Sequence, residues 1–141
     1  LVSLNSNLRN DIFFKGLIKK KILKKKNFIN YNYKFYSKKK IDELNDRVKK
    51  MTINVAIMGL GSNGHVASIY NLKNKNLSNF YLINNSPKIP RSRITISLKN
   101  IHKCKNIILI AAKKNKEKEI RNIRNNSLLK NNLQKLKLLI L

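Results

Sequence analysis

The sequence predicts an α/β domain with a mostly parallel sheet, and three observations support this. Apolar, strand-like runs alternate with amphipathic helical segments along most of the 141 residues. The run at 106–112 is wholly apolar, as is typical of a strand buried in a parallel sheet. The run that begins at Ile53 alternates only loosely, which also predicts a buried strand, and a loop containing three glycines follows it at once.

The N-terminal third predicts two helices. Residues 6–26 carry apolar side chains at helical spacing with lysines opposite, which favours a surface helix facing the core over one lying on a membrane. Residues 37–50 predict a second helix, with Ser37 as its N-cap and Ile41, Leu44 and Val48 as its apolar stripe. Its three acidic residues are expected on the solvated surface.

The remaining elements follow in order. Residues 53–72 predict a strand, the glycine loop and a helix. The two prolines within 86–92 predict an extended loop, because a proline disfavours helical geometry in the residue before it. The other expected elements are strands at 80–84 and 93–98, a short turn or helix around 100–104, a helix at 114–125 with Ile120 and Ile123 inward, and a low-complexity tail at 127–141 after a domain of 1–126.

The formal net charge of +26 suggests nucleic-acid binding, because a basic surface attracts phosphates and releases counterions. However, only six of the 32 basic residues are Arg, and Lys, Asn and Ile are all abundant, as A/T-rich codons would produce. The aromatic side chains that stack on bases total ten, without any Trp. We therefore expect nonspecific binding of polyanions.

The single cysteine, Cys104, excludes an internal disulfide. Together with His102 it supplies two kinds of metal ligand but no second pair, so no metal site is predicted. No apolar run approaches the roughly 20 residues of a membrane span, and the N-terminus lacks the apolar core of a signal peptide. These features predict a cytoplasmic protein, or one in a comparable reducing compartment.

The glycine loop is the feature with the clearest chemical meaning. Its sequence GLGSNG fits the dinucleotide pattern G-x-G-x-x-G, but that site needs an acidic residue about 20 positions later. No Asp or Glu occurs between Asp46 and Glu117, which argues against NAD and against a kinase glycine loop. With a helix expected next, the loop amides should face an anion, and His65 should lie at the helix N-terminus.

The same gap in carboxylates excludes other chemistries. A carboxylate dyad, a carboxylate-bound Mg²⁺ and a Ser-His-Asp triad cannot be built from the central residues. What remains is His65, amides and hydroxyls, and several cations. Such a set suits a small phosphorylated substrate and one acid–base step without a metal.

At this point a family resemblance can be stated. The segment GLGSNGHVASIY resembles the 6-phosphogluconolactonase signature G-x-G-x-D-G-H-x-A-S-L-F, and PKIPRSRITISL resembles the second conserved block of that family. The second block continues through KNIHKCKNIILIAAKKNKEKEI, which resembles the family's short helix, apolar strand and Lys-bearing helix. With NSNLRNDIFFKGLI upstream, the resemblance covers about residues 5–125. The related glucosamine-6-phosphate deaminases share the glycine core, but HVASIY and Arg93-Ile94-Thr95 favour the lactonase branch.

The resemblance implies an incomplete three-layer, Rossmann-like domain that hydrolyses 6-phosphogluconolactone in the pentose phosphate pathway without a cofactor. It implies that His65 is the general base, kept neutral by the helix dipole, and that Arg93 and Lys116 face the substrate phosphate. Loop amides would stabilise the oxyanion. The implied substrate-binding residues are Gly59, Gly61, Asn63, Gly64, Ser68, Arg93 and Lys116.

The chain departs from the family pattern in three ways. Asn63 stands where the family has Asp, and the chain begins, at Leu1, beyond the place of the family's phosphate loop and Asp-Glu-Arg motif. The family's C-terminal segment is also not recognisable in the tail. We therefore expect a fragment or a degenerate copy with weak or no activity alone, and a fusion or complementation partner that supplies the N-terminal segment.

Overall fold

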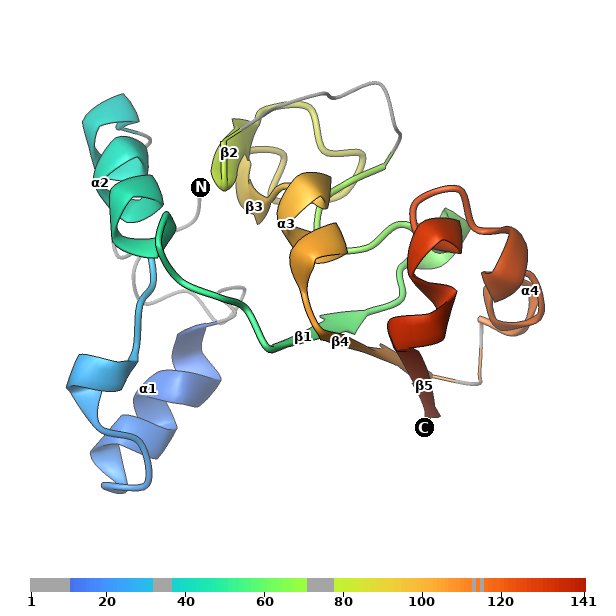
Figure 1. Ribbon diagram of the computed structural model, residues 1–141, viewed down its shortest axis with the longest axis horizontal. Coiled ribbons are helices and arrows are strands. Elements are labelled where there is room, and N and C mark those ends of the chain that lie inside the picture. Colours follow the sequence, from blue (N-terminus) through green and yellow to red (C-terminus); the bar gives the residue numbers. More distant parts are fainter. Residues whose placement is uncertain (1–10, 32–36, 71–77, 113, 115) are drawn as a thin grey trace.

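A parallel three-stranded sheet forms the centre of the protein (Figure 1). The computed structural model describes residues 11–31, 37–70, 78–112, 114 and 116–141. Strand β4 (Asn106–Ala111) lies between β1 (Val55–Gly59) and β5 (Leu136–Ile140), and both pairings are parallel. The predicted α/β class with a parallel sheet is confirmed.

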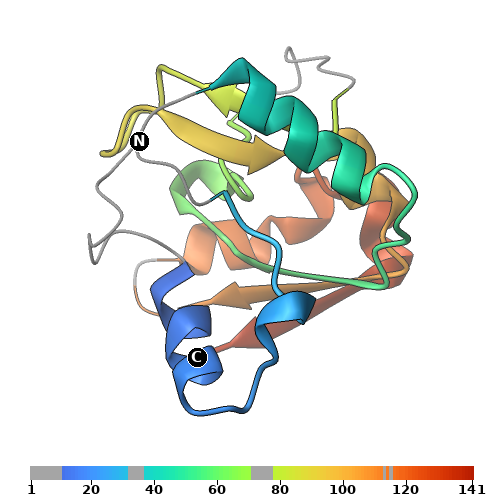
Figure 2. The ribbon, with the colours of Figure 1, turned by 90° about the vertical axis from the view of Figure 1, so that its left-hand side faces the viewer.

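A separate antiparallel pair lies beside this sheet. Strand β2 (Phe80–Ile83) pairs with β3 (Arg93–Ile96), and the loop with two prolines joins them. Helix α2 (Lys38–Val48) runs along this pair (Figure 2). Its Asn45 side chain donates a hydrogen bond to the Phe80 carbonyl at 3.1 Å and accepts one from the Phe80 amide at 2.7 Å. The polar face of α2 thus fixes the edge of the hairpin.

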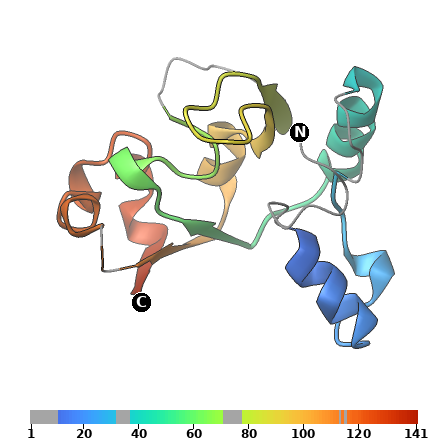
Figure 3. The same ribbon diagram turned by 180° about the vertical axis from the view of Figure 1, so that it is seen from behind.

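The helices are short, and most of them lie toward the two ends of the molecule. Helices α1 (Asp11–Lys19) and α2 lie at the end opposite to α4 (Glu117–Arg121), with α3 (Leu98–Lys103) between them (Figures 1 and 3). Ser37 caps α2, as predicted, by accepting a hydrogen bond from the Lys40 amide. The 3-10 helices are η1 (Lys25–Asn27), η2 (Ser62–Gly64), η3 (Ile123–Asn125) and η4 (Lys130–Lys135).

The first predicted helix is shorter than expected. The sequence predicts a helix over residues 6–26, of which residues 6–10 lie outside the described part of the chain. In the rest of that span, only α1 is α-helical. Lys21 has a φ of 59°, which turns the backbone out of right-handed helical geometry. The apolar pattern correctly placed the helix but not its end.

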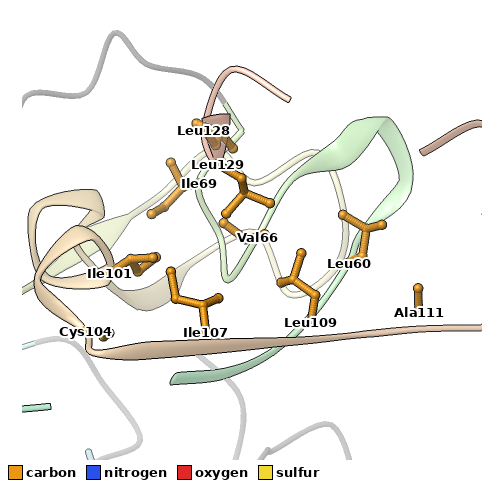
Figure 4. Close-up of a cluster of buried hydrophobic side chains, with 10 residues drawn as sticks. All are labelled: Leu60, Val66, Ile69, Ile101, Cys104, Ile107, Leu109, Ala111, Leu128 and Leu129. Atoms are coloured by element: carbon orange, nitrogen blue, oxygen red, sulfur yellow. The ribbon is translucent and has the colours of Figure 1, made fainter. Parts of the chain in front are cut away.

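The hydrophobic core covers one face of the sheet (Figure 4). Ile107, Leu109 and Ala111 of β4 point to this face, and each is exposed by 1% or less, because alternate residues of a strand share a face. Ile120 and Ile123 pack against the core, as predicted. The segment 127–141 contributes buried Leu128 and Leu129 and strand β5, so it packs as part of the same unit.

The opposite face of the sheet is apolar and exposed. Val55 and Ile57 of β1 are 46% and 65% exposed, and Leu139 of β5 is 49% exposed. The prediction that the first strand is buried is therefore wrong for this face. Its side chains alternate between the packed core and solvent.

The segment after the glycine loop is not helical. Between Leu60 and Tyr70 the chain forms η2 and then two isolated bridges, Leu60 with Val66 and Val66 with Ile69. The Gly61 amide donates to the His65 carbonyl at 2.8 Å, which turns the chain back toward β1. The prediction of a helix is therefore wrong for 65–70, and its last residues, 71–72, lie outside the described part.

Candidate active site

His65 lies directly over the backbone of Gly61. A Cβ atom at position 61 would overlap the imidazole ring, so glycine is required there. The ring atom Nδ1 lies 2.7 Å from the carbonyl oxygen of Ser62. Because a carbonyl only accepts hydrogen bonds, Nδ1 carries the proton, and Nε2 bears the lone pair. The loop therefore holds His65 in the tautomer that a general base needs.

The glycine loop is closed by hydrogen bonds within the loop and by hydrogen bonds from a segment distant in the sequence. Asn63 and Gly64 have φ values of 64° and 73°, in the left-handed region. The Asn126 side chain donates to the Gly64 carbonyl at 2.8 Å and accepts from the Leu128 amide at 2.9 Å. A Cβ at Gly64 would lie 2.7 Å from Asn126 Nδ2. This clamp ties the loop to the core residues that follow Asn126.

The loop amides are used differently from the prediction. The Gly61 amide donates to the His65 carbonyl, the Gly64 amide to the Gly61 carbonyl, and the Asn63 amide to Glu119. The expectation that the loop presents its amides to a bound anion is therefore wrong for these three groups, because the Gly61 and Gly64 amides close the turn and the Asn63 amide is taken by the Glu119 carboxylate of α4. The assignment of Gly61, Asn63 and Gly64 as substrate-binding residues stays a prediction.

Cations surround the imidazole. Burial lowers the pKa of His65 most, the positive charges of Lys88, Lys116 and Arg93 lower it further, and the Ser62 carbonyl opposes them. Because the unperturbed value is 6.5, His65 is neutral at pH 7. The predicted neutral base is thus supported, but its predicted cause is wrong, since no helix begins at His65 within the described residues.

Arg93 and Lys88 form one wall of the site. The Arg93 guanidinium donates to the carbonyl oxygens of Pro90, Lys88 and Ile89 at 2.8, 3.0 and 3.1 Å, which holds the loop between β2 and β3. From this loop Lys88 Nζ donates to Ser62 Oγ at 2.7 Å. Arg93 therefore orders the loop that carries Lys88 to the site.

Lys116 contributes a positive charge from the start of α4. It is the residue before α4 and occupies the N-cap position of that helix, without a capping hydrogen bond from its side chain. Its charge acts on His65 together with those of Lys88 and Arg93. The structure thus brings together three of the sequence-predicted residues, namely His65, Arg93 and Lys116.

Ser68 and Gly59 lie farther along the same region. Ser68 is buried, and its amide donates to Thr95 Oγ1 at 3.2 Å. It borders a groove of about 770 Å³, here called the β1 groove, between β1, the β2–β3 pair and the start of α1. Gly59 ends β1, and a Cβ there would meet no atom within 4 Å. The β1 groove is lined mainly by Ile53, Val55, Ile57, Ile89, Arg93 and Ile94.

The sequence did not reveal several residues of the site. The Tyr70 ring lies 4.5 Å from the His65 ring, and its hydroxyl bonds to Ser86 Oγ at 2.9 Å. Glu119 and Asn126 are more than 50 positions from the loop they contact, so no local pattern could have identified them. Lys88 could have been found, because it lies between the two prolines of a loop expected near Arg93.

The described residues contain neither a metal-binding cluster nor a membrane-spanning helix. In that part of the chain no three His, Cys, Asp or Glu side chains gather in a way that could hold a metal ion. Nor does it contain a helix that is both long and apolar enough to cross a membrane.

Comparison with known proteins gives the ancestry of this site. The sequence model of the glucosamine-6-phosphate isomerases/6-phosphogluconolactonase family matches residues 2–133. The chain belongs to this family. A Caenorhabditis elegans protein named "Putative 6-phosphogluconolactonase" is 32% identical over 87 residues, which cover 58% of this chain and 31% of that protein. The lactonase resemblance seen in the sequence is confirmed at the level of the family.

Solved structures of family members show the same fold. The 6-phosphogluconolactonase of Trypanosoma brucei aligns with a TM-score of 0.61 at 16% identity, covering 79% of this chain and 55% of that one. The Thermotoga maritima enzyme gives a TM-score of 0.61 at 18% identity, covering 75% and 51%. The chain therefore spans about half the length of these solved relatives.

Proposed function

We propose that this chain carries the general base of a site that hydrolyses 6-phospho-D-glucono-1,5-lactone to 6-phosphogluconate in the oxidative pentose phosphate pathway. The observation that carries the proposal is the environment of His65, a partly buried neutral imidazole with Nδ1 bound to the Ser62 carbonyl and cations around it. Family membership supplies the substrate class.

The imidazole would act first as a base and then as an acid. Nε2 takes a proton from water as the water oxygen bonds to the lactone carbonyl carbon, giving a tetrahedral oxyanion. The oxyanion then reforms the carbonyl, the ring C–O bond breaks, and the proton on Nε2 passes to the departing ring oxygen. The product is the open acid, and His65 returns to its neutral form.

The cations would bind the substrate phosphate and stabilise negative charge. Lys88 and Lys116 act as point charges, whereas Arg93 already uses Nε and Nη2 on the loop carbonyls. Arg93 would therefore bind phosphate through Nη1 while holding Lys88 in position. Gly59 and Ser68, beside the loop, would contact the sugar.

The test measures the rate of lactone hydrolysis above the spontaneous rate for the unmodified chain, for His65→Ala and for a matched control, His102→Ala. His102 is the other histidine and lies on α3, where its ring contacts the Leu128 carbonyl at 3.4 Å. We expect activity to be lost with His65→Ala and retained with His102→Ala. Hydrolysis unchanged by His65→Ala would overturn the proposal, and turnover of glucosamine 6-phosphate instead would favour the deaminase branch.

We further infer that full activity requires an additional segment that packs in the β1 groove. Ile57 and Ile89, which line this groove, are 65% and 79% exposed, and the chain spans about half of its solved relatives. A longer chain that includes such a segment, or a separate fusion partner, could supply it. We expect the extended chain to hydrolyse the lactone faster; equal rates would contradict this inference.

The charge of the chain supports a weaker, second kind of binding. With 32 basic and six acidic residues, we expect RNA and other polyanions to bind without sequence preference. Retention on RNA should disappear at moderate salt, whereas salt-resistant, sequence-dependent binding would indicate a dedicated nucleic-acid function. The compartment that we propose for the protein is the cytoplasm.

A further inference from the structure

One peptide group connects His65 to a carboxylate. The peptide between Ser62 and Asn63 accepts a hydrogen bond from His65 Nδ1 at its carbonyl oxygen, over 2.7 Å. The N–H of the same peptide donates to Glu119 Oε1 over 2.9 Å. The sequence separation of 56 positions is bridged because α4 packs against η2. The order of groups is therefore carboxylate, peptide, imidazole.

We propose that Glu119 is a positioning residue that acts on His65 through this peptide. A negative charge at the N–H side polarises the amide, and hydrogen bonds in a chain strengthen one another. The Ser62 carbonyl becomes a better acceptor, which favours the tautomer with the proton on Nδ1 and increases the basicity of Nε2. The proposal rests on the proposed function insofar as His65 is the base.

The charges around the Glu119 carboxylate and around the His65 imidazole agree with this role. The hydrogen bond from the Asn63 amide lowers the pKa of Glu119, with smaller contributions from Lys116 and Lys118, so the carboxylate is ionised at neutral pH. At the other end Lys88, Lys116 and Arg93 disfavour a charged imidazole. Glu119 is opposite in charge to these cations, and its hydrogen bond goes to the Asn63 amide.

The position of Glu119 gives the arrangement a specific meaning in this chain. Asn63 occupies the loop position at which the family pattern has Asp, so the loop itself carries no negative charge. Glu119 brings a carboxylate to the backbone of that same residue from α4. The carboxylate bound to this loop therefore comes from another element of the fold.

The experiment compares Glu119→Gln with Glu117→Gln in the 141-residue chain. Glutamine keeps an oxygen that can accept from the Asn63 amide but removes the charge. Glu117 is the matched control, because it lies on the same helix and faces Arg121 at 3.8 Å, away from the loop. Nitrogen NMR of labelled His65 reports the tautomer and the pKa of the ring without requiring catalysis, and lactone hydrolysis is measured in parallel.

We expect Glu119→Gln to lower the pKa of His65 by a few tenths of a unit and kcat by about two- to fivefold, as for an exposed charge interaction. KM should stay unchanged, and Glu117→Gln should alter none of these values. An unchanged tautomer and pKa in Glu119→Gln would overturn the proposal and leave Glu119 as a simple tether. If the NMR shift appears but His65→Ala leaves hydrolysis unaffected, the proposed function fails while the connection through the peptide stands.

Discussion

The two faces of the parallel sheet carry similar residues but have opposite environments. On one face Ile107 and Leu109 are fully buried beneath α3 and the C-terminal segment. On the other face Val55 and Ile57, of the same apolar character, are about half exposed or more. Composition therefore does not distinguish the two faces, and only the elements packed against them do.

The comparison extends to the candidate active site, which is built on the packed side. The loop that holds His65 is continuous with Leu60 and Val66 of the core, and Asn126 joins it to buried Leu128. The β1 groove, in contrast, is lined in part by the exposed side chains of Ile57 and Ile89. The loop that holds His65 can therefore be fully packed while an adjoining wall of the domain is open.

The largest expected effect separates the two faces directly. Leu109→Ala should reduce the free energy of unfolding by about 2–5 kcal/mol, because it leaves a cavity in the packed face. Ile57→Ala, the matched change on the exposed face, should reduce it by about 0.5 kcal/mol or less. Urea denaturation followed by circular dichroism measures both. Similar losses would show that the exposed face is covered in solution.

The second effect concerns the loop on the packed side. Gly61→Ala places a methyl group where the imidazole lies, so the ring must move. A displacement of this kind should reduce kcat/KM for the lactone by about 100-fold. Gly16→Ala, in α1, is the control, because a Cβ there meets no atom within 4 Å. Full activity in Gly61→Ala would show that His65 does not act from this position.

A smaller effect is expected where the loop is clamped to the core. Asn126→Ala removes the donor to the Gly64 carbonyl and the acceptor for the Leu128 amide. We expect a loss of about 1–2 kcal/mol in the free energy of unfolding. Asn122→Ala, at an exposed position between α4 and η3, should cost much less. Equal losses in the two variants would contradict the clamp.

A smaller change is expected in the pH dependence of lactone hydrolysis. Lys88→Met removes one of the cations that lower the pKa of His65, so that pKa should rise by a few tenths of a unit. The acid limb of lactone hydrolysis, where protonation inactivates the base, should move to higher pH by the same amount. Lys99→Met, on α3, is the control. An acid limb that stays in place would show that Lys88 lies too far from the ring to act on it.

The stability of the chain should depend on the same group. Because the folded-state pKa of His65 is depressed, its neutral form favours folding at pH values above the unfolded value of 6.5. That contribution is lost as the pH falls through the lower, folded-state pKa. The unfolding temperatures of the chain and of His65→Ala, measured between pH 5 and 7.5, should therefore change with pH at different slopes.

Much of the organisation could be predicted from local patterns. The strands at 80–84, 93–98 and 106–112 and the Ser37-capped helix were placed correctly because each depends on neighbouring residues. The helix after the glycine loop was predicted wrongly, since Val66 bridges both Leu60 and Ile69 and the turn is closed by hydrogen bonds. Local helix propensity could not reveal these bridges and hydrogen bonds, which depend on how the loop packs in the fold.

The glycine loop, the histidine that follows it and the family of the chain can be identified from the sequence, because contiguous residues carry them. The fold determines which groups lie around the His65 loop, since Glu119, Asn126 and Lys88 come to it from three other segments. It also decided the cause of the neutral imidazole, which is burial and nearby cations, because the environment of a titratable group depends on what the fold packs around it.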